Sequence, residues 1–226
     1  MLLHFLLDKY EKMEPILRVD LQKVVRKKYK AQFPDILKRA STQLNLVYGL
    51  EMKKGGPKCH SYILESKVGP STENNLCGIK EFSKKGLLMT LLSVIFMKGN
   101  HATEDEVWEF LNVLGIQAGK KNIIFVEPRN LILTELVEAN YLEYHQVPGN
   151  DSPCFEFLWG PRAHAETTKM KVLEFLSQIT GTTPSAFPSL NEEALREKAE
   201  RAEKRAAARA GRSPKTRANV RFKMTD

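Results

Sequence analysis

The residue types that most often bind metals or act as nucleophiles are scattered along this chain of 226 residues. The three cysteines, Cys59, Cys77 and Cys154, are an odd number and match no C-x-x-C zinc pattern, so buried or free thiols in a reducing compartment are expected. Cys59 and His60 are adjacent, and on a strand their side chains would point to opposite faces. No metal ion or other cofactor is therefore expected.

Catalytic groupings are also missing from the pattern. The densest acidic cluster, Glu104-Asp105-Glu106, is better explained as the first turn of a helix, where acids favour the helix dipole, than as paired catalytic carboxylates. His101 and His164 are isolated, and such histidines usually make structural hydrogen bonds. The sequence contains no G-x-S-x-G elbow, P-loop, dinucleotide-binding turn or H-E-x-x-H motif. We therefore do not expect an enzyme.

The net charge of +8 is concentrated at the C-terminus. The segment from Lys204 to Asp226 contains eight basic residues and one acid, so it carries +7 and leaves +1 for the other 203 residues. One basic patch remains in this nearly neutral body, and its members are Lys23, Arg26, Lys27, Lys28 and Lys30. The patch and the tail are the places where nucleic acid or an acidic partner could bind.

Membrane and secretion signals are not expected. The longest apolar run, Leu87 to Met97, is about half as long as a bilayer requires. The opening MLLHFLLDKYEKM has neither a basic n-region nor a small-residue cleavage site, so it is not a signal peptide. We expect an intracellular protein, in the nucleus or the cytoplasm, with no membrane partner.

The strongest helical pattern lies between Gly86 and Gly115. Apolar residues at three- and four-residue spacing predict a core helix that stops at Gly99-Asn100, and Thr103 with Glu106 predicts a capping box for the next helix. A helix starting at Pro128, a hairpin over YLEYHQV and CFEFLWG, and a helix from Ala163 to Gly181 follow. These elements make a predicted unit over residues 86–190.

The same order of elements occurs earlier in the chain. Helices are predicted over 2–10, over 21–30 and from Pro34 to Gly49, and a hairpin with its tip at Gly55-Gly56-Pro57 follows over 50–67. Three helices and a hairpin are typical of a winged helix. The predicted fold is therefore mainly α with small β-hairpins, as tandem winged-helix units over 1–67 and 86–190, a linker over 68–85 and a basic, largely disordered tail over 191–226.

Six apolar residues give the first helix an unusually wide apolar surface: Leu2, Leu3, Phe5, Leu6, Leu7 and Tyr10. At 100° per residue they cover an arc of about 200°, roughly twice what a surface helix needs to pack on its own core. With Leu2, Phe5 and Leu6 turned to the core, Leu3 and Leu7 form an outer shoulder and Tyr10 lies between. We expect either a second partner on this shoulder or a helix that its own domain buries on both sides.

Reading of duplex DNA by a third helix is not favoured. In the second unit this helix, over 128–141, carries Arg129 against two glutamates, so phosphate would repel it. In the first unit Lys38 and Arg39 stand beside Asp35. Protein binding accounts better for a neutral body with an apolar first helix.

Five segments resemble the homology domain of the melanoma-antigen (MAGE) family, and its B subgroup most of all, over about residues 2–190. They are FLLDKYEKMEPIL, KKYKAQFPDILKRAS, LLSVIFMKGNHATEDEVWEFL, YLEYHQVP and FEFLWGPRAHAETTKMKVLEFL. The resemblance implies tandem winged-helix units in a non-enzymatic partner of RING-type E3 ubiquitin ligases. Such proteins stimulate these ligases or direct them to substrate proteins, and B-subgroup members look like partners of a tripartite-motif ligase that also acts as a transcriptional corepressor.

The resemblance also points to residues in the first helix. A dileucine pair contacts the ligase in this family, and the F-L-L-x-K-Y segment places that pair at Leu6 and Leu7. Together with the outer-shoulder argument, this gives Leu3, Leu6, Leu7 and Tyr10 as the predicted ligase-binding residues. The alternative function is nucleic-acid binding by the basic patch and the tail.

Overall fold

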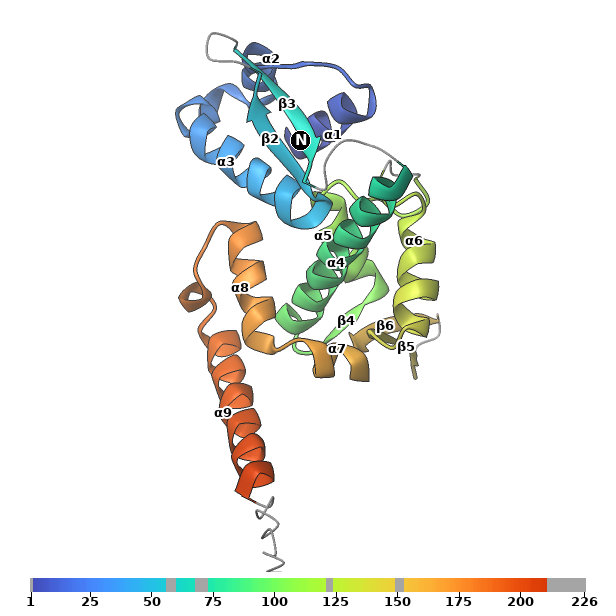
Figure 1. Cartoon of the computed structure of the whole chain (residues 1–226). Helices are drawn as coiled ribbons and strands as arrows, with labels where there is room; N and C mark the ends of the chain where they lie inside the picture. The colour runs from blue at the N-terminus through green and yellow to red at the C-terminus, as the bar shows by residue number, and fades with distance from the viewer. Residues whose placement is uncertain (1, 56–59, 68–72, 121–123, 149–152, 211–226) are drawn as a thin grey trace, which may run out of the picture.

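The computed structural model describes residues 2–55, 60–67, 73–120, 124–148 and 153–210. Figure 1 shows two parts, one above the other: an N-terminal unit (residues 2–67) and a C-terminal unit (residues 73–210). Each part is mainly helical and contains one small antiparallel sheet of three strands. The predicted fold class, mainly α with small hairpins in winged-helix-like units, is confirmed.

The described residues of the N-terminal unit form three α-helices, two short helices of other types and three strands. Its elements are α1 (Leu2–Glu11), β1 (Ile16–Leu17), α2 (Arg18–Val24), η1 (Lys27–Gln32), α3 (Phe33–Gln43), η2 (Leu44–Tyr48), β2 (Leu50–Lys54) and β3 (Ser61–Ser66). The predicted hairpin is present as β2 and β3, in register from Leu50 opposite Ser66 to Lys54 opposite Tyr62. The strand β1 pairs with the other edge of β3 and was not predicted, because two residues are too short to show an alternating pattern. Most of the hairpin tip, 56–59, lies outside the described residues.

The helix predicted over 21–30 is interrupted, which corrects the sequence interpretation. Helix α2 ends at Val24, and the next residue, Val25, has an extended backbone with φ −79° and ψ 121°. Val25 is buried, and a β-branched side chain is comfortable in this conformation. Arg26 precedes the 3-10 helix η1, which carries Lys27, Lys28 and Lys30, so Lys23 and the other cations of the patch lie on different elements.

The C-terminal unit is larger and is organised around one long helix. Its elements are α4 (Glu73–Met97), β4 (His101–Thr103), α5 (Glu104–Val113), α6 (Pro128–Asn130), η3 (Leu131–Leu136), β5 (Leu142–Val147), β6 (Cys154–Trp159), α7 (Pro161–Glu166), α8 (Lys169–Thr180), η4 (Pro184–Ala186) and α9 (Pro188–Ala210). The sheet order is β4-β6-β5. The predicted capping box is confirmed, since the Thr103 hydroxyl accepts from the Glu106 N–H while the Glu106 carboxylate accepts from the Thr103 N–H. Positive φ angles at Gly99 and Asn100 follow the end of α4, as expected.

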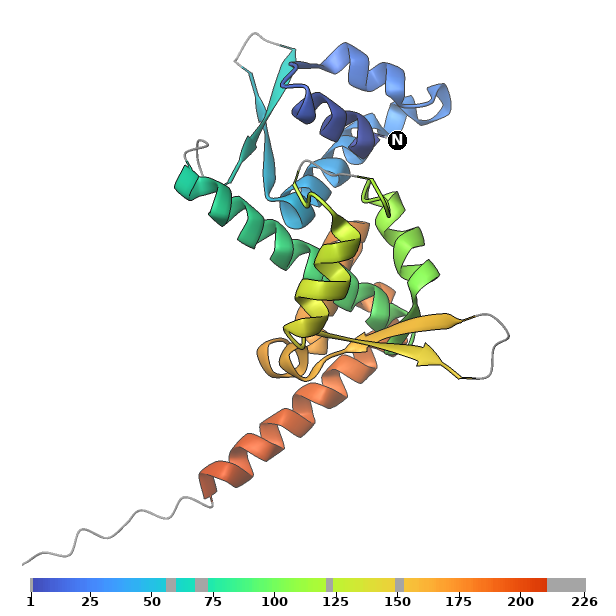
Figure 2. The same ribbon diagram turned by 90° about the vertical axis from the view of Figure 1, so that its right-hand side faces the viewer.

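Residues 73–85 are helical rather than an irregular linker. The stretch forms the first half of α4, which in Figures 1 and 2 begins beside the N-terminal unit and runs into the C-terminal unit. Packing explains why turn-forming residues are overruled: the buried Ser83 hydroxyl donates to the Tyr48 carbonyl (3.1 Å), and Gly86 lies so close to η2 that a Cβ would be 2.5 Å from the Val47 carbonyl oxygen. The division of the chain into separate domains stays a prediction.

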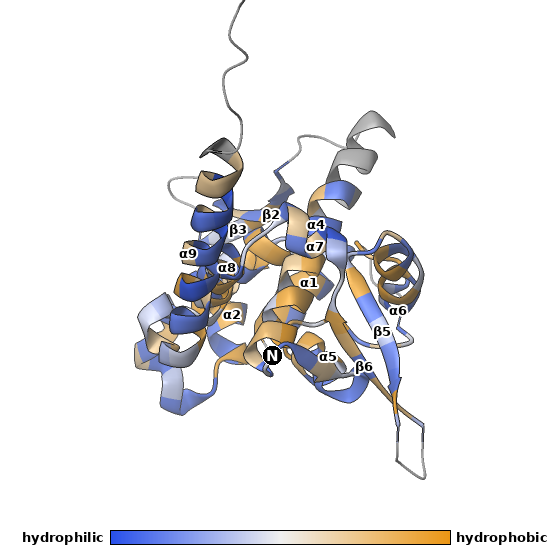
Figure 3. Cartoon of the chain, turned by 90° about the horizontal axis from the view of Figure 1, so that it is seen from below, coloured by the Kyte–Doolittle hydropathy of each residue, from blue (hydrophilic) through white to orange (hydrophobic). Residues whose placement is uncertain are grey.

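The expectation of a disordered tail from residue 191 is wrong for its first part, because α9 runs through Ala210. Ala194 is fully buried, Lys169 pairs with Glu193, and the Glu197 carboxylate accepts from the Lys169 N–H (2.8 Å), so the base of α9 is attached to α8. Farther along, the helix projects from the body and is largely hydrophilic (Figures 1 and 3). Residues 211–226 lie outside the described part.

The predicted helix from Ala163 is two helices. Helix α7 ends at Glu166, and α8 begins after Thr168, whose hydroxyl accepts from the Lys171 N–H (3.3 Å). Gly181, with φ 69°, terminates α8 where the sequence predicted a stop. The break turns α8 upward beside α4 and toward α3 (Figure 1).

Candidate protein-interaction site

Helix α1 is the element to which the sequence assigned partner binding, and its orientation differs from the prediction. Leu3 and Leu7 do not form an exposed shoulder: they are 5% and 9% exposed, and Leu6 is fully buried. Phe5, which was expected in the core, is only partly buried, and the Lys9 ammonium lies 5.7 Å from its ring centroid. In the chain without a partner, α1 therefore fits the second expectation, a helix that its own protein buries on both sides.

Leu7 contacts the C-terminal unit. At Gly115, which follows α5 with φ 91°, a Cβ would lie 3.1 Å from Leu7 Cδ1 and 3.4 Å from the Tyr48 hydroxyl oxygen. This hydroxyl donates a buried hydrogen bond to the Leu114 carbonyl (2.6 Å), and burial raises the pKa of Tyr48. Leu7 and Tyr48 thus face the turn at Leu114-Gly115, and we call this contact between the two units the seam.

A second contact joins the units through α3 and α8. The Gln43 side-chain amide donates to the Ile179 carbonyl (3.0 Å). The Arg39 guanidinium lies against the end of α8, where a Cβ on Gly181 would be 2.9 Å from Arg39 Nε. Because α8 lies against α3, the helix that would enter a DNA groove in other winged helices is partly covered by protein.

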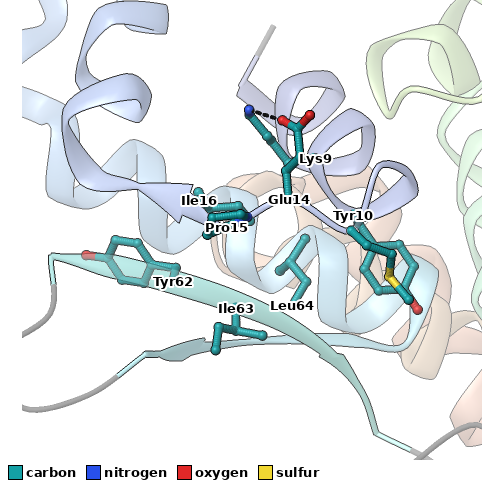
Figure 4. A pocket seen from close by; sticks show the side chains of 9 residues that line it. Lys9, Tyr10, Glu14, Pro15, Ile16, Tyr62, Ile63 and Leu64 are labelled. Atoms are coloured by element: carbon teal, nitrogen blue, oxygen red, sulfur yellow. Dashed lines mark hydrogen bonds and ion pairs between the residues drawn. The ribbon is translucent and has the colours of Figure 1, made fainter.

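Tyr10 lies on another side of α1, in a cleft of about 270 Å³ between the end of the helix and strand β3 (Figure 4). Burial raises the pKa of Tyr10. The cleft is lined by Lys9, Tyr10, Met13, Glu14, Pro15, Ile16, Tyr62, Ile63 and Leu64. Met13 and Ile63 are 86% and 48% exposed, so the cleft opens onto apolar surface. The structure therefore does not bring Leu6, Leu7 and Tyr10 together on one exposed face.

The basic patch is exposed to solvent. Lys23, Arg26, Lys27, Lys28 and Lys30 are all exposed. Lys23 pairs with Asp20 at 3.0 Å, whereas Lys28 lies 4.7 Å above the ring of Tyr29. Of the predicted site residues, these cations are the ones that solvent reaches directly.

Glu104 has a larger structural role than the predicted one, which was to interact favourably with the helix dipole. Its carboxylate accepts from the Tyr144 hydroxyl, the Trp108 indole (3.2 Å) and Arg129 (3.1 Å), so it joins α5, α6 and β5. Burial raises the pKa of Glu104, but these hydrogen bonds and the Arg129 charge outweigh burial and the net pKa is lowered. Burial and the bond to Glu104 raise the pKa of Tyr144 to about 12.

The remaining chemical candidates do not gather into a site. Within the described ranges, no group of three or more histidine, cysteine or acidic residues could hold a metal ion. His101 lies 3.8 Å from Glu156, and the His164 ring centroid lies 5.3 Å from that of Trp159. Among these same residues, no helix is long and apolar enough to cross a membrane.

Tyr48 and the Leu114-Gly115 turn were not predicted as parts of a contact between the units. The sequence signal at Tyr48 was an aromatic residue directly before Gly49, the predicted helix end. At Gly115 the signal was the glycine itself, which fits the observed positive φ. Neither signal says that the two residues meet, because they are 67 positions apart and belong to different units.

The chain is similar to known proteins in sequence and in structure. The model of the MAGE homology domain matches residues 2–170. Human melanoma-associated antigen B1 is 53% identical over 94% of this chain and 61% of that protein, and mouse melanoma-associated antigen B4 is 50% identical over all of this chain and 41% of that protein. A chain of the solved Nse1-Nse3-Nse4 complex matches with 40% identity and a TM-score of 0.50, covering 86% of this chain and 94% of that one. The chain thus spans less than two thirds of the length of these melanoma-associated antigens.

Proposed function

Because the chain belongs to the MAGE family, we propose that it is a non-enzymatic adaptor that binds a RING-type E3 ubiquitin ligase through helix α1. The ligase we favour is of the tripartite-motif class, as the resemblance to the B subgroup implies. In this role the bound ligase would be stimulated or directed to a substrate protein. The similarity to a chain of a multi-protein assembly, the Nse1-Nse3-Nse4 complex, supports a function in protein binding.

The observation that carries the proposal is the position of Leu7 in the seam. Leu6 is fully buried, and Leu7 faces the turn at Gly115, which belongs to the other unit. In our proposal this turn separates from Leu7 while α1 stays folded. We therefore assign the ligase contact to Leu7 and a packing role to Leu6. Docking on Leu7 requires the C-terminal unit to move away from α1.

The energies allow such an exchange of partners. Burying one leucine side chain on a partner contributes about 1.5–3 kcal/mol before association costs are subtracted. The closed seam lowers the apparent affinity by the fraction of molecules in which it is open. A change that opens the seam should therefore strengthen ligase binding even when it leaves α1 unchanged.

The test compares two substitutions on opposite sides of the seam, measured by co-precipitation with a purified tripartite-motif ligase. Leu7→Ala should reduce ligase capture by about tenfold, because it removes the contact. Gly115→Ala should increase capture, because its Cβ crowds Leu7 and its backbone is at a positive φ that disfavours alanine. Leu88→Ala in α4 is the matched control, a leucine truncation outside α1 that should leave capture unchanged.

Circular dichroism melts establish that each variant is folded before capture is compared. Full capture of folded Leu7→Ala contradicts the proposed contact. If Gly115→Ala lowers capture as much as Leu7→Ala, docking does not require the seam to open and that part of the proposal is wrong.

A further inference from the structure

Four cations of the basic patch have no counter-charge among the described residues of the protein. Arg26, Lys27, Lys28 and Lys30 are exposed, and none forms an ion pair with a carboxylate in the part of the chain that the structure describes. Lys23 differs, because Asp20 neutralises it at 3.0 Å. The effective patch is therefore Arg26 with the three lysines of η1, a set that we call the η1 patch.

The geometry of η1 concentrates this charge. A 3-10 helix rises about 2.0 Å per residue and places residues three apart on one side, so Lys27 and Lys30 project together about 6 Å apart along the axis. Four positive charges within five residues complement a ligand with closely spaced negative charges. The phosphates of a nucleic-acid strand are such closely spaced negative charges.

An exposed aromatic ring lies in the middle of the cations. Tyr29 is 39% exposed, and the Lys28 ammonium lies 4.7 Å from its ring centroid. Proteins that bind single-stranded nucleic acid combine cations for the backbone with aromatic rings on which bases stack. A run of carboxylates on an acidic protein would use the cations but would gain little from the ring.

The environment of α3 disfavours duplex DNA as the ligand. Reading a duplex through a winged helix requires α3 to enter the major groove, but Arg39 and Gln43 of α3 contact the end of α8. The η1 patch lies just before α3 and stays open. The geometry points to the η1 patch as a binding site for single-stranded nucleic acid, with Arg26, Lys27, Lys28 and Lys30 on phosphates and Tyr29 stacked on a base.

The experiment uses the full chain and a fluorescein-labelled 20-nucleotide oligothymidine, with binding followed by fluorescence anisotropy between 50 and 200 mM NaCl. Arg26→Gln/Lys27→Gln/Lys28→Gln/Lys30→Gln should weaken binding at least tenfold at low salt and reduce the salt slope by about 2 to 3, since each phosphate contact on a single strand contributes about 0.7. Tyr29→Ala should weaken binding about fivefold or more while leaving the salt slope unchanged.

A variant with the same loss of charge at other exposed positions separates the patch from net charge and from the basic tail. Its substitutions are Lys54→Gln, Lys85→Gln, Lys120→Gln and Lys171→Gln. This control should bind within about twofold of the wild type. Equal weakening in the patch variant and the control overturns the proposal. So does tighter binding of a 20-base-pair duplex with no effect of Tyr29→Ala, or displacement of the oligonucleotide by polyglutamate at equal charge concentration.

Discussion

The helices that open the two units, α1 and α4, are both strongly apolar but use their apolar surface differently. In α4, Leu87, Leu91, Ile95 and Phe96 are at most 1% exposed and lie in the hydrophobic core. In α1, Leu6 is as completely buried, but Leu7 is covered by a turn from the other unit. An apolar face wider than its own core requires can therefore be hidden in a seam between units. We take the seam, and not the core, as the part that can be exchanged for a partner.

Phe96→Ala in α4 is expected to have the largest effect and tests the first half of this comparison. Phe96 is fully buried and packs edge to face with Trp159, with 6.3 Å between ring centroids. Removing the ring should lower the free energy of unfolding by about 3–5 kcal/mol, which urea denaturation measures. Leu7→Ala should cost less than half as much, and equal losses would show that the seam is as integral to the fold as the core.

Glu104→Gln is expected to have the next largest effect. It tests how much the hydrogen bonds of Glu104, which lie within the C-terminal unit and away from the seam, stabilise the fold. The substitution removes the charge that Arg129, Tyr144 and Trp108 surround, so we expect the free energy of unfolding to fall by about 1–2 kcal/mol at pH 7. The pKa of Glu104 is lowered in the folded chain, so its stabilisation is present above the unfolded-state pKa of about 4.3 and is lost as the pH falls through the lower folded value.

Urea denaturation between pH 3 and pH 7 measures this dependence. The wild type should lose stability relative to Glu104→Gln as the pH decreases, so the two curves converge. Parallel curves would show that Glu104 does not act through its charge. Glu109→Gln, an exposed acid on the same helix, serves as the control.

Local patterns predicted the parts of the fold that depend on near neighbours. Thr103 with Glu106, Pro128 at a helix start and Gly181 at a helix end each act through their own backbone and were correctly placed. The two hairpins follow from alternation across short loops. These signals are sufficient for element order and for the winged-helix class.

The errors occur where distant residues decide. The predicted rotation of α1 was wrong. The apolar arc shows how much of the helix surface must be buried, but the side on which Leu7 meets the other unit depends on its contact with Gly115. Residues 73–85 were misjudged because the contact of Gly86 with η2 is invisible in composition. Helix α9 was underestimated for the same reason, since Ala194 and the Lys169 pairs attach it to α8. The exposure of the basic patch could be predicted because exposed charge needs no packing partner, and ligand binding by the patch stays a prediction.

Tyr48→Phe is expected to have the smallest effect on stability and the most specific effect on the seam. It removes one buried hydrogen bond, to the Leu114 carbonyl, while keeping the ring beside Phe125 at 5.5 Å between centroids. The free energy of unfolding should fall by about 1 kcal/mol. Hydrogen exchange should become faster in α1 and in the turn at Gly115, while α4 amides near Phe96 keep their protection. Uniformly faster exchange in α1 and α4 would mean that the two helices open together, and the contrast between a separable seam and a permanent core would then not hold.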